Sequence, residues 1–182
     1  MNRHVTRRIR KLLGDTRGSI AVEFALVAPV LMIMLAGVID VGSAAYARLS
    51  LQSRVTTAGE FALMADLDAD ALAESAMGLL RGRASETAEV VVNNAAKAKW
   101  DGSEVTTQSL SGDAMACYCP TRSDGQIEWG SSVGCETSCD TSGDSAGRFV
   151  QISATADHVS IFPGYAFIDG DMVRASAVLR LN

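Results

Sequence analysis

The chain has 182 residues, which is enough for one domain with attachments and too few for two large domains. Hydrophobic residues make up 48% of it, so a core can form. The net charge of −5 is unevenly distributed, because residues 1–17 contribute +5 and the remaining residues −10. A basic arm on an acidic body can serve either nucleic acid or a membrane surface.

An apolar segment follows the basic arm. Phe24–Ile39 is a run of 16 uncharged, mostly apolar residues. A basic flank before such a run is typical of positive-inside membrane insertion, so we expect the lipid bilayer, and no nucleic acid, as partner. A span needs about 20 helical residues. Ile20–Tyr46 supplies that length if Glu23 and Asp40 lie near its two edges.

The alternative to a retained span is a cleaved secretory signal, with Ala45-Tyr46-Ala47 as the cleavage site. The apolar stretch is longer than the roughly 7–15 residues of a signal-peptide core, and helical spacing continues beyond the site. A retained helix is therefore favoured. We expect a basic cytoplasmic leader at 1–18, a transmembrane helix at 19–46 and an extracytoplasmic domain at 47–182.

Glu23 lies inside the apolar helix, where ionisable residues are costly and usually functional. A cut after Gly18 would give Ser19 a new α-amino group, four residues before Glu23 and on the same helix face. The carboxylate could then pair with the amine of its own chain or of a neighbouring subunit, and it would also favour the helix N-terminus. This is the pattern of type IV prepilins.

The longer stretch at residues 17–31, RGSIAVEFALVAPVL, resembles the N-terminus of TadE-like proteins of the tight-adherence (Flp pilus) machinery. Tyr46-Ala47-Arg48 and Gln52 extend the likeness. The resemblance implies cleavage by a prepilin peptidase, with a processing motif made by Gly18, Ser19, Glu23 and Phe24. It also implies a pseudopilin or accessory component for assembly of type IVb (Flp) pili.

The same resemblance implies a single-pass protein of the bacterial inner membrane, with a cytoplasmic N-terminus and a periplasmic C-terminal domain. The expected partners are the prepilin peptidase, the lipid bilayer, and other pilin-like and Tad assembly proteins that contact the membrane helix. No small-molecule substrate is expected. The alternative function is a secreted, disulfide-bonded binding or adhesion module released by signal peptidase near Ala47.

Beyond the span, apolar residues at helical spacing predict an amphipathic continuation to about Leu67, with Gly59 as a possible bend. Further helices are expected at 71–80, capped by the acids before it, and at 86–99. Residues 121–148 are predicted to be a long loop. Period-two or extended patterns predict strands at 105–110, 114–119, 149–158 and 172–181. The expected fold is α+β and pilin-like, with the long helix packed on a small antiparallel sheet.

Four cysteines, Cys117, Cys119, Cys135 and Cys139, define a Cys-rich loop at 117–139. The alternatives are disulfides, zinc ligands and free or redox-active cysteines, and an oxidising compartment favours disulfides. Two connectivities remain open: 117–139 with 119–135, or 117–135 with 119–139. The two histidines, His4 and His158, do not form a catalytic pattern, and phosphate-loop and metalloprotease motifs are absent. We expect no enzyme activity, no cofactor and no metal.

Overall fold

A computed structural model describes residues 17–123, 126–140, 143–158 and 172–181. The described residues divide into two compact units, one comprising residues 17–42 and the other the described residues from 43 onwards. The basic leader up to residue 16, with His4, lies outside the described residues.

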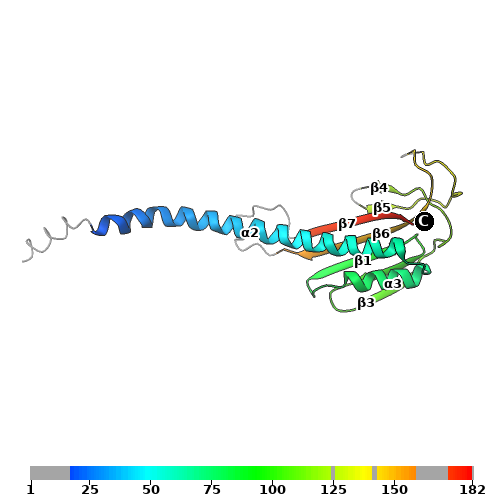
Figure 1. Cartoon of the computed structure of the whole chain (residues 1–182), viewed down its shortest axis with the longest axis horizontal. Helices are drawn as coiled ribbons and strands as arrows, with labels where there is room; N and C mark the ends of the chain where they lie inside the picture. The colour runs from blue at the N-terminus through cyan, green and yellow to red at the C-terminus, as the bar shows by residue number, and fades with distance from the viewer. Residues whose placement is uncertain (1–16, 124–125, 141–142, 159–171, 182) are drawn as a thin grey trace, which may run out of the picture. The chain divides into compact units, whose positions relative to one another are not determined.

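The helix α2, Arg17–Met64, has 48 residues and is followed by α3, Ala69–Leu80. A five-stranded antiparallel sheet has the order β3-β2-β1-β6-β7 (Figure 1). Its strands are β1 Glu86–Val92, β2 Ala96–Trp100, β3 Val105–Ser109, β6 Arg148–Asp157 and β7 Met172–Leu181. The long helix and the antiparallel sheet confirm the α+β class.

The core of the larger unit forms between one face of this sheet and the helices α2 and α3. The second half of α2 contributes one stripe of buried residues at helical spacing: Leu51, Val55, Ala58 and Ala62. Alternate residues of β1 and β6 fill the facing layer, including Val90 and Ile152, both fully buried. Burial of every second strand residue is the pattern of a sheet with one covered face.

Gly59 was expected to allow a bend, but α2 runs through it without a break. Its role is close packing instead, because a Cβ at this position would collide with the side chain of Leu179 in β7. The absence of a side chain therefore lets the helix approach the sheet closely.

The helix predicted at 71–80 is confirmed as α3. Asp68 caps it, since its Oδ1 accepts a hydrogen bond of 2.8 Å from the backbone N–H of Ala71. One face of α3 is buried in the core, and its members are Leu72, Ala73, Ala76, Met77 and Leu80.

The helix predicted at 86–99 is wrong. This segment forms the β1–β2 hairpin, whose turn has positive φ at both Asn93 (48°) and Asn94 (55°). The N–H of Ala95 closes the turn on the carbonyl of Val92 at 2.9 Å. Asparagine tolerates this left-handed conformation, and the three valines before it favour a strand, so local chemistry selects the hairpin.

The predicted strands near 105–110, 149–158 and 172–181 are confirmed as β3, β6 and β7. The strand predicted at 114–119 is wrong, because only isolated bridges occur there, Cys117 with Val133 and Tyr118 with Gly147. Within the predicted loop, β4 (Thr121–Ser123) and β5 (Gln126–Glu128) pair as a short hairpin. The disulfide-bonded turns around them replace regular ladder pairing in this region.

Candidate functional site

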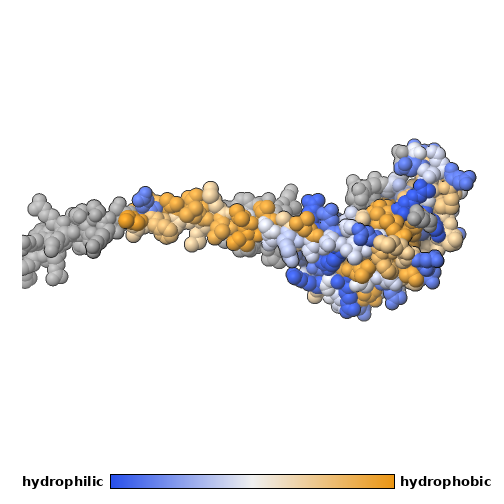
Figure 2. Space-filling view, in the orientation of Figure 1, coloured by the Kyte–Doolittle hydropathy of each residue, from blue (hydrophilic) through white to orange (hydrophobic). Residues whose placement is uncertain are grey.

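The first candidate site is the N-terminal half of α2, an apolar helix with exposed side chains. Its large apolar residues from Ile20 to Val41 are 47–74% exposed. The most apolar 18-residue window has a mean hydropathy of 2.4, and none of it is buried. Figure 2 shows apolar surface over the visible side of this segment. A helix with apolar residues on all sides requires lipid or partner helices around it.

Glu23 lies near the start of this helix, and its side chain is exposed. Residues Gly18 and Ser19 are already helical, so Ser19 and Glu23 are one turn apart on the same face. Phe24 follows with 67% of its surface exposed. Among the described residues, no cation forms an ion pair with the Glu23 carboxylate. The geometry thus leaves this acid available to a group outside the described chain.

Asp40 is the second acid of the helix, and it is only 2% exposed. It lies 17 positions after Glu23, which corresponds to about 26 Å along an α-helix. This length is close to the thickness of a bilayer core, about 30 Å. The spacing of the two acids is therefore compatible with a span between them.

The second candidate site is the Cys-rich loop, which is held by two disulfides, Cys117–Cys135 and Cys119–Cys139. This is one of the two connectivities that the sequence left open. Cys117 and Cys139 are buried beside Ala146 in a small cluster separate from the main core. In a segment with so few apolar contacts, each bridge contributes about 2–4 kcal/mol to stability.

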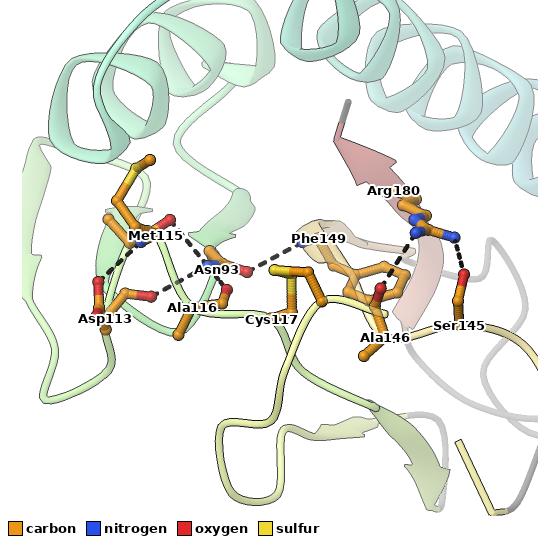
Figure 3. Close-up of a disulfide and its surroundings, with 11 residues drawn as sticks. Asn93, Asp113, Met115, Ala116, Cys117, Ser145, Ala146, Phe149 and Arg180 are labelled. Atoms are coloured by element: carbon orange, nitrogen blue, oxygen red, sulfur yellow. Dashed lines mark hydrogen bonds between the residues drawn. A yellow bond between two sulfur atoms is a disulfide. The ribbon is translucent and has the colours of Figure 1, made fainter. Parts of the chain in front are cut away.

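Asn93 attaches the segment just before the Cys-rich loop to the sheet (Figure 3). Its Nδ2 donates to the carbonyls of Asp113 (3.1 Å), Ala114 (3.0 Å) and Ala116 (2.7 Å). Its Oδ1 accepts from the N–H of Phe149 at 3.2 Å. The side chain is 1% exposed, so these bonds satisfy a buried amide that would otherwise be costly.

Arg180 of β7 holds the segment that follows the Cys-rich loop. It donates to the Oγ of Ser145 at 3.0 Å and to the carbonyl of Ala146 at 3.1 Å (Figure 3). Sequence reasoning identified neither Asn93 nor Arg180. The Asn93-Asn94 pair after a valine run was the available signal for the first, while no local pattern marks the second.

Metal ligation has no structural support in the described ranges, where no group of three or more His, Cys, Asp or Glu side chains is placed to hold an ion. The four cysteines are consumed by the two disulfides. His158 is 9% exposed and lies apart from both candidate sites in sequence.

These features define a class: an α+β protein with one helix long and apolar enough to cross a membrane, followed by a disulfide-bonded domain. A family model described as "TadE-like protein" matches residues 18–60, which confirms the resemblance over most of α2. Neither the curated proteins nor the solved structures give a match. The family match supports involvement in Tad (Flp pilus) systems, and the TadE-like family is not a known enzyme family.

Proposed function

We propose that the protein is a membrane-anchored pseudopilin or accessory component for assembly of Flp (type IVb) pili. The observation that carries this proposal is one exposed carboxylate, Glu23, in an exposed apolar helix that the TadE-like model matches. An acid in such a position is costly in lipid unless it finds a cationic partner. A filament or assembly complex of helices supplies such partners.

The partner that fits this geometry is an α-amine created by cleavage between Gly18 and Ser19. Cleavage within α2 by a prepilin peptidase would leave the new amine one helical turn from Glu23. The positive amine would stand at a helix N-terminus, where the dipole disfavours it, so the carboxylate stabilises both groups. In an assembly, the amine of one subunit can also meet Glu23 of the next.

The proposed location is the bacterial inner membrane, with residues 47–182 in the periplasm. Two disulfides support an oxidising compartment for this domain, because cytosolic thiols are normally kept reduced. The basic leader supports a cytoplasmic N-terminus. Together these observations support the proposed domain division into leader 1–18, span 19–46 and outer domain.

The alternative, a secreted module released near Ala47, has less support. Ala47 lies in the interior of α2, and Leu51, one turn further, is already buried in the core. A cut there would remove most of the helix that leads into this packed segment. A cut at Gly18 removes only the first two residues of the described helix.

The experiment that tests the proposal is N-terminal sequencing and intact mass measurement of the native protein extracted from membranes. A mature chain that begins with Ser19 is expected. The variant Gly18→Arg is expected to keep its leader, whereas the matched variant Gly42→Arg, at an exposed glycine of the same helix, is cut normally. A mature chain that begins after Ala47 would refute the proposal and support the secreted module.

A second test separates assembly from processing. Glu23→Gln removes the charge, and Glu60→Gln is the matched control because Glu60 is exposed in α2 outside the apolar half. We expect Glu23→Gln to insert in the membrane but to lose crosslinks to pilin-like subunits by about tenfold, which corresponds to roughly 1.4 kcal/mol. Unchanged crosslinking of Glu23→Gln would remove the carboxylate from the mechanism.

A further inference from the structure

The face of the sheet opposite the helices carries a cavity of about 650 Å³. Central strands β1 and β6 supply much of its floor, β7 supplies one side and the residues after β5 supply part of the wall. The lining includes several side chains that can form hydrogen bonds to a ligand, together with the indole of Trp129. The hydrogen-bonding residues are Glu89, Gln151, Ser153, Thr155 and Arg174.

Trp129 provides a fixed aromatic wall. Its ring meets the ring of Tyr118 edge to face, with centroids 5.8 Å apart and an interplanar angle of 79°. Tyr118 is itself 3% exposed, and its hydroxyl accepts a 3.0 Å hydrogen bond from the N–H of Asp113. Trp129 remains half-buried and lines the cavity, so its position is set by packing before any ligand arrives.

The cavity has an available positive charge at Arg174. This side chain is exposed, and within the described residues no hydrogen bond or ion pair to it is present. The only acid of the lining, Glu89, pairs with Lys97 at 2.7 Å. Arg174 lies opposite Thr155 in the β6–β7 register, next to hydroxyl groups of the floor. An anionic group is therefore favoured on this side of the cavity.

The floor restricts how a ligand can be recognised. Strand β1 pairs with β2 and β6, and β6 pairs with β1 and β7, so both strands have neighbours on each side. An extended peptide cannot add to these strands through main-chain hydrogen bonds, which is the usual mode for sheet edges. Over these two strands, recognition must come from hydroxyl, amide and guanidinium groups together with stacking on an indole.

We propose that this cavity binds a carbohydrate whose sugar residues carry carboxylates, that is, a uronic-acid polysaccharide. The apolar face of a pyranose ring packs on Trp129, its hydroxyls bond to Gln151, Ser153 and Thr155, and its carboxylate pairs with Arg174. This activity goes beyond pilus assembly. It does not depend on cleavage at Gly18 or on Glu23.

The test uses the full-length protein in detergent micelles, titrated with an oligomer of galacturonic acid. Trp129 is the half-buried tryptophan at the site, whereas Trp100 is 4% exposed in the core, so binding is expected to change the fluorescence of Trp129. Trp129→Phe should abolish that signal, while calorimetry still detects binding. Trp129→Ala and Arg174→Gln should each weaken binding by about tenfold. Lys99→Gln is the charge control, because Lys99 is exposed on β2 and does not line the cavity.

Several outcomes would overturn the proposal. A neutral oligosaccharide of equal length that binds as tightly would remove the role of the carboxylate. Polyglutamate binding with the same dependence on Arg174 would assign the site to an acidic peptide. Absence of binding at about 10 mM ligand, or affinity unchanged in both site variants, would mean that the cavity is not a sugar site. Unchanged thermal unfolding of each variant shows that lost binding is not lost folding.

Discussion

The two halves of α2 have similar backbone geometry but opposite surroundings. From Ile20 to Val41 the large apolar side chains are at least 47% exposed, whereas Leu51, Val55, Ala58 and Ala62 are 0–3% exposed. The first half is apolar around its circumference, and the second has one buried stripe with a mixture of polar and apolar residues elsewhere. Helix propensity explains why both halves of α2 are helical. The distribution of apolar residues explains why the first half needs an apolar environment on all sides and the second half packs on one protein surface.

Side-chain size also separates the halves. The first half is rich in large aliphatic residues, whereas the second half has Ala58, Gly59 and Ala62 at its contact with the sheet. Small residues allow the helix backbone to come close to β7, as the position of Leu179 shows. The second half is therefore shaped for one protein surface, while the first accepts lipid or several helices.

The largest expected effect concerns the environment of the first half. The double variant Leu31→Arg/Leu35→Arg places two charges in the middle of the apolar run, and each costs roughly 3 kcal/mol for membrane insertion. We expect most of the protein to leave the membrane fraction, as measured by carbonate extraction. The control Leu63→Arg/Leu67→Arg changes two exposed residues beyond the first half and should leave extraction unchanged. Equal loss in both variants would contradict the assignment of lipid contact to the first half alone.

The next effect concerns packing of the second half. Gly59→Leu forces a side chain into the space of Leu179, so we expect a loss of about 2–3 kcal/mol in the free energy of unfolding. Gly42→Leu is the matched control, because no atom lies within 4 Å of a Cβ at that position. Urea unfolding followed by circular dichroism measures both. A Gly59→Leu protein as stable as its control would show that the helix does not need this close approach.

A smaller effect comes from the ion pair that links α2 to β1. Arg54 donates to the Glu86 carboxylate at 2.7 Å, and Arg54 also reaches the carbonyl of Leu80 at 3.5 Å. Arg54→Met should cost about 1 kcal/mol, because the pair is partly open to solvent. Arg48→Met, at an exposed position of the same helix, is expected to stay within about 0.5 kcal/mol of the parent protein. Equal stability of the two variants would show that the pair contributes nothing measurable.

The same pair predicts a pH dependence. Burial alone would raise the pKa of Glu86, but the hydrogen bonds from Arg54 and the Arg83 N–H and the charges of both arginines lower it below its ordinary value of 4.5. A lowered folded-state pKa means that the stabilisation is complete above about pH 4.5 and is lost as the pH falls through the folded value. Glu86→Gln should flatten this part of the stability profile. A profile with the same slope in parent and variant would assign the dependence to other carboxylates.

Sequence patterns predicted the elements whose signals are local and long. The apolar run of α2, the acidic cap before α3 and the alternating pattern of β6 and β7 are each visible in a short stretch of sequence. The structure contains all of these elements. The family resemblance was likewise carried by a contiguous stretch, which the TadE-like model matches at 18–60. The cysteine count predicted two disulfides but could not select their pairing, because both connectivities span loops of similar length.

The features that were predicted wrongly or missed depend on very short sequence motifs or on contacts between residues far apart in the chain. Residues that would lie on one side of a short helix suggested a helix at 86–99, while two adjacent asparagines with positive φ turn the chain into a hairpin. The cavity beside Trp129 is made by residues from β1, β5, β6 and β7 regions, whose convergence depends on strand order. Arg180 contacts Ser145, which lies 35 residues earlier in the chain, and no spacing pattern in the sequence predicts such a contact.

The contact between Gly59 and Leu179 also constrains how the protein is made. The two residues are 120 positions apart, so α2 leaves the ribosome long before its partner strand β7 exists. Until that strand is made, the surface of α2 at Gly59 lacks the Leu179 side chain that packs against it. The contact between α2 and β7 can therefore close only after almost the whole chain has been synthesised, which places completion of this part of the core late in folding.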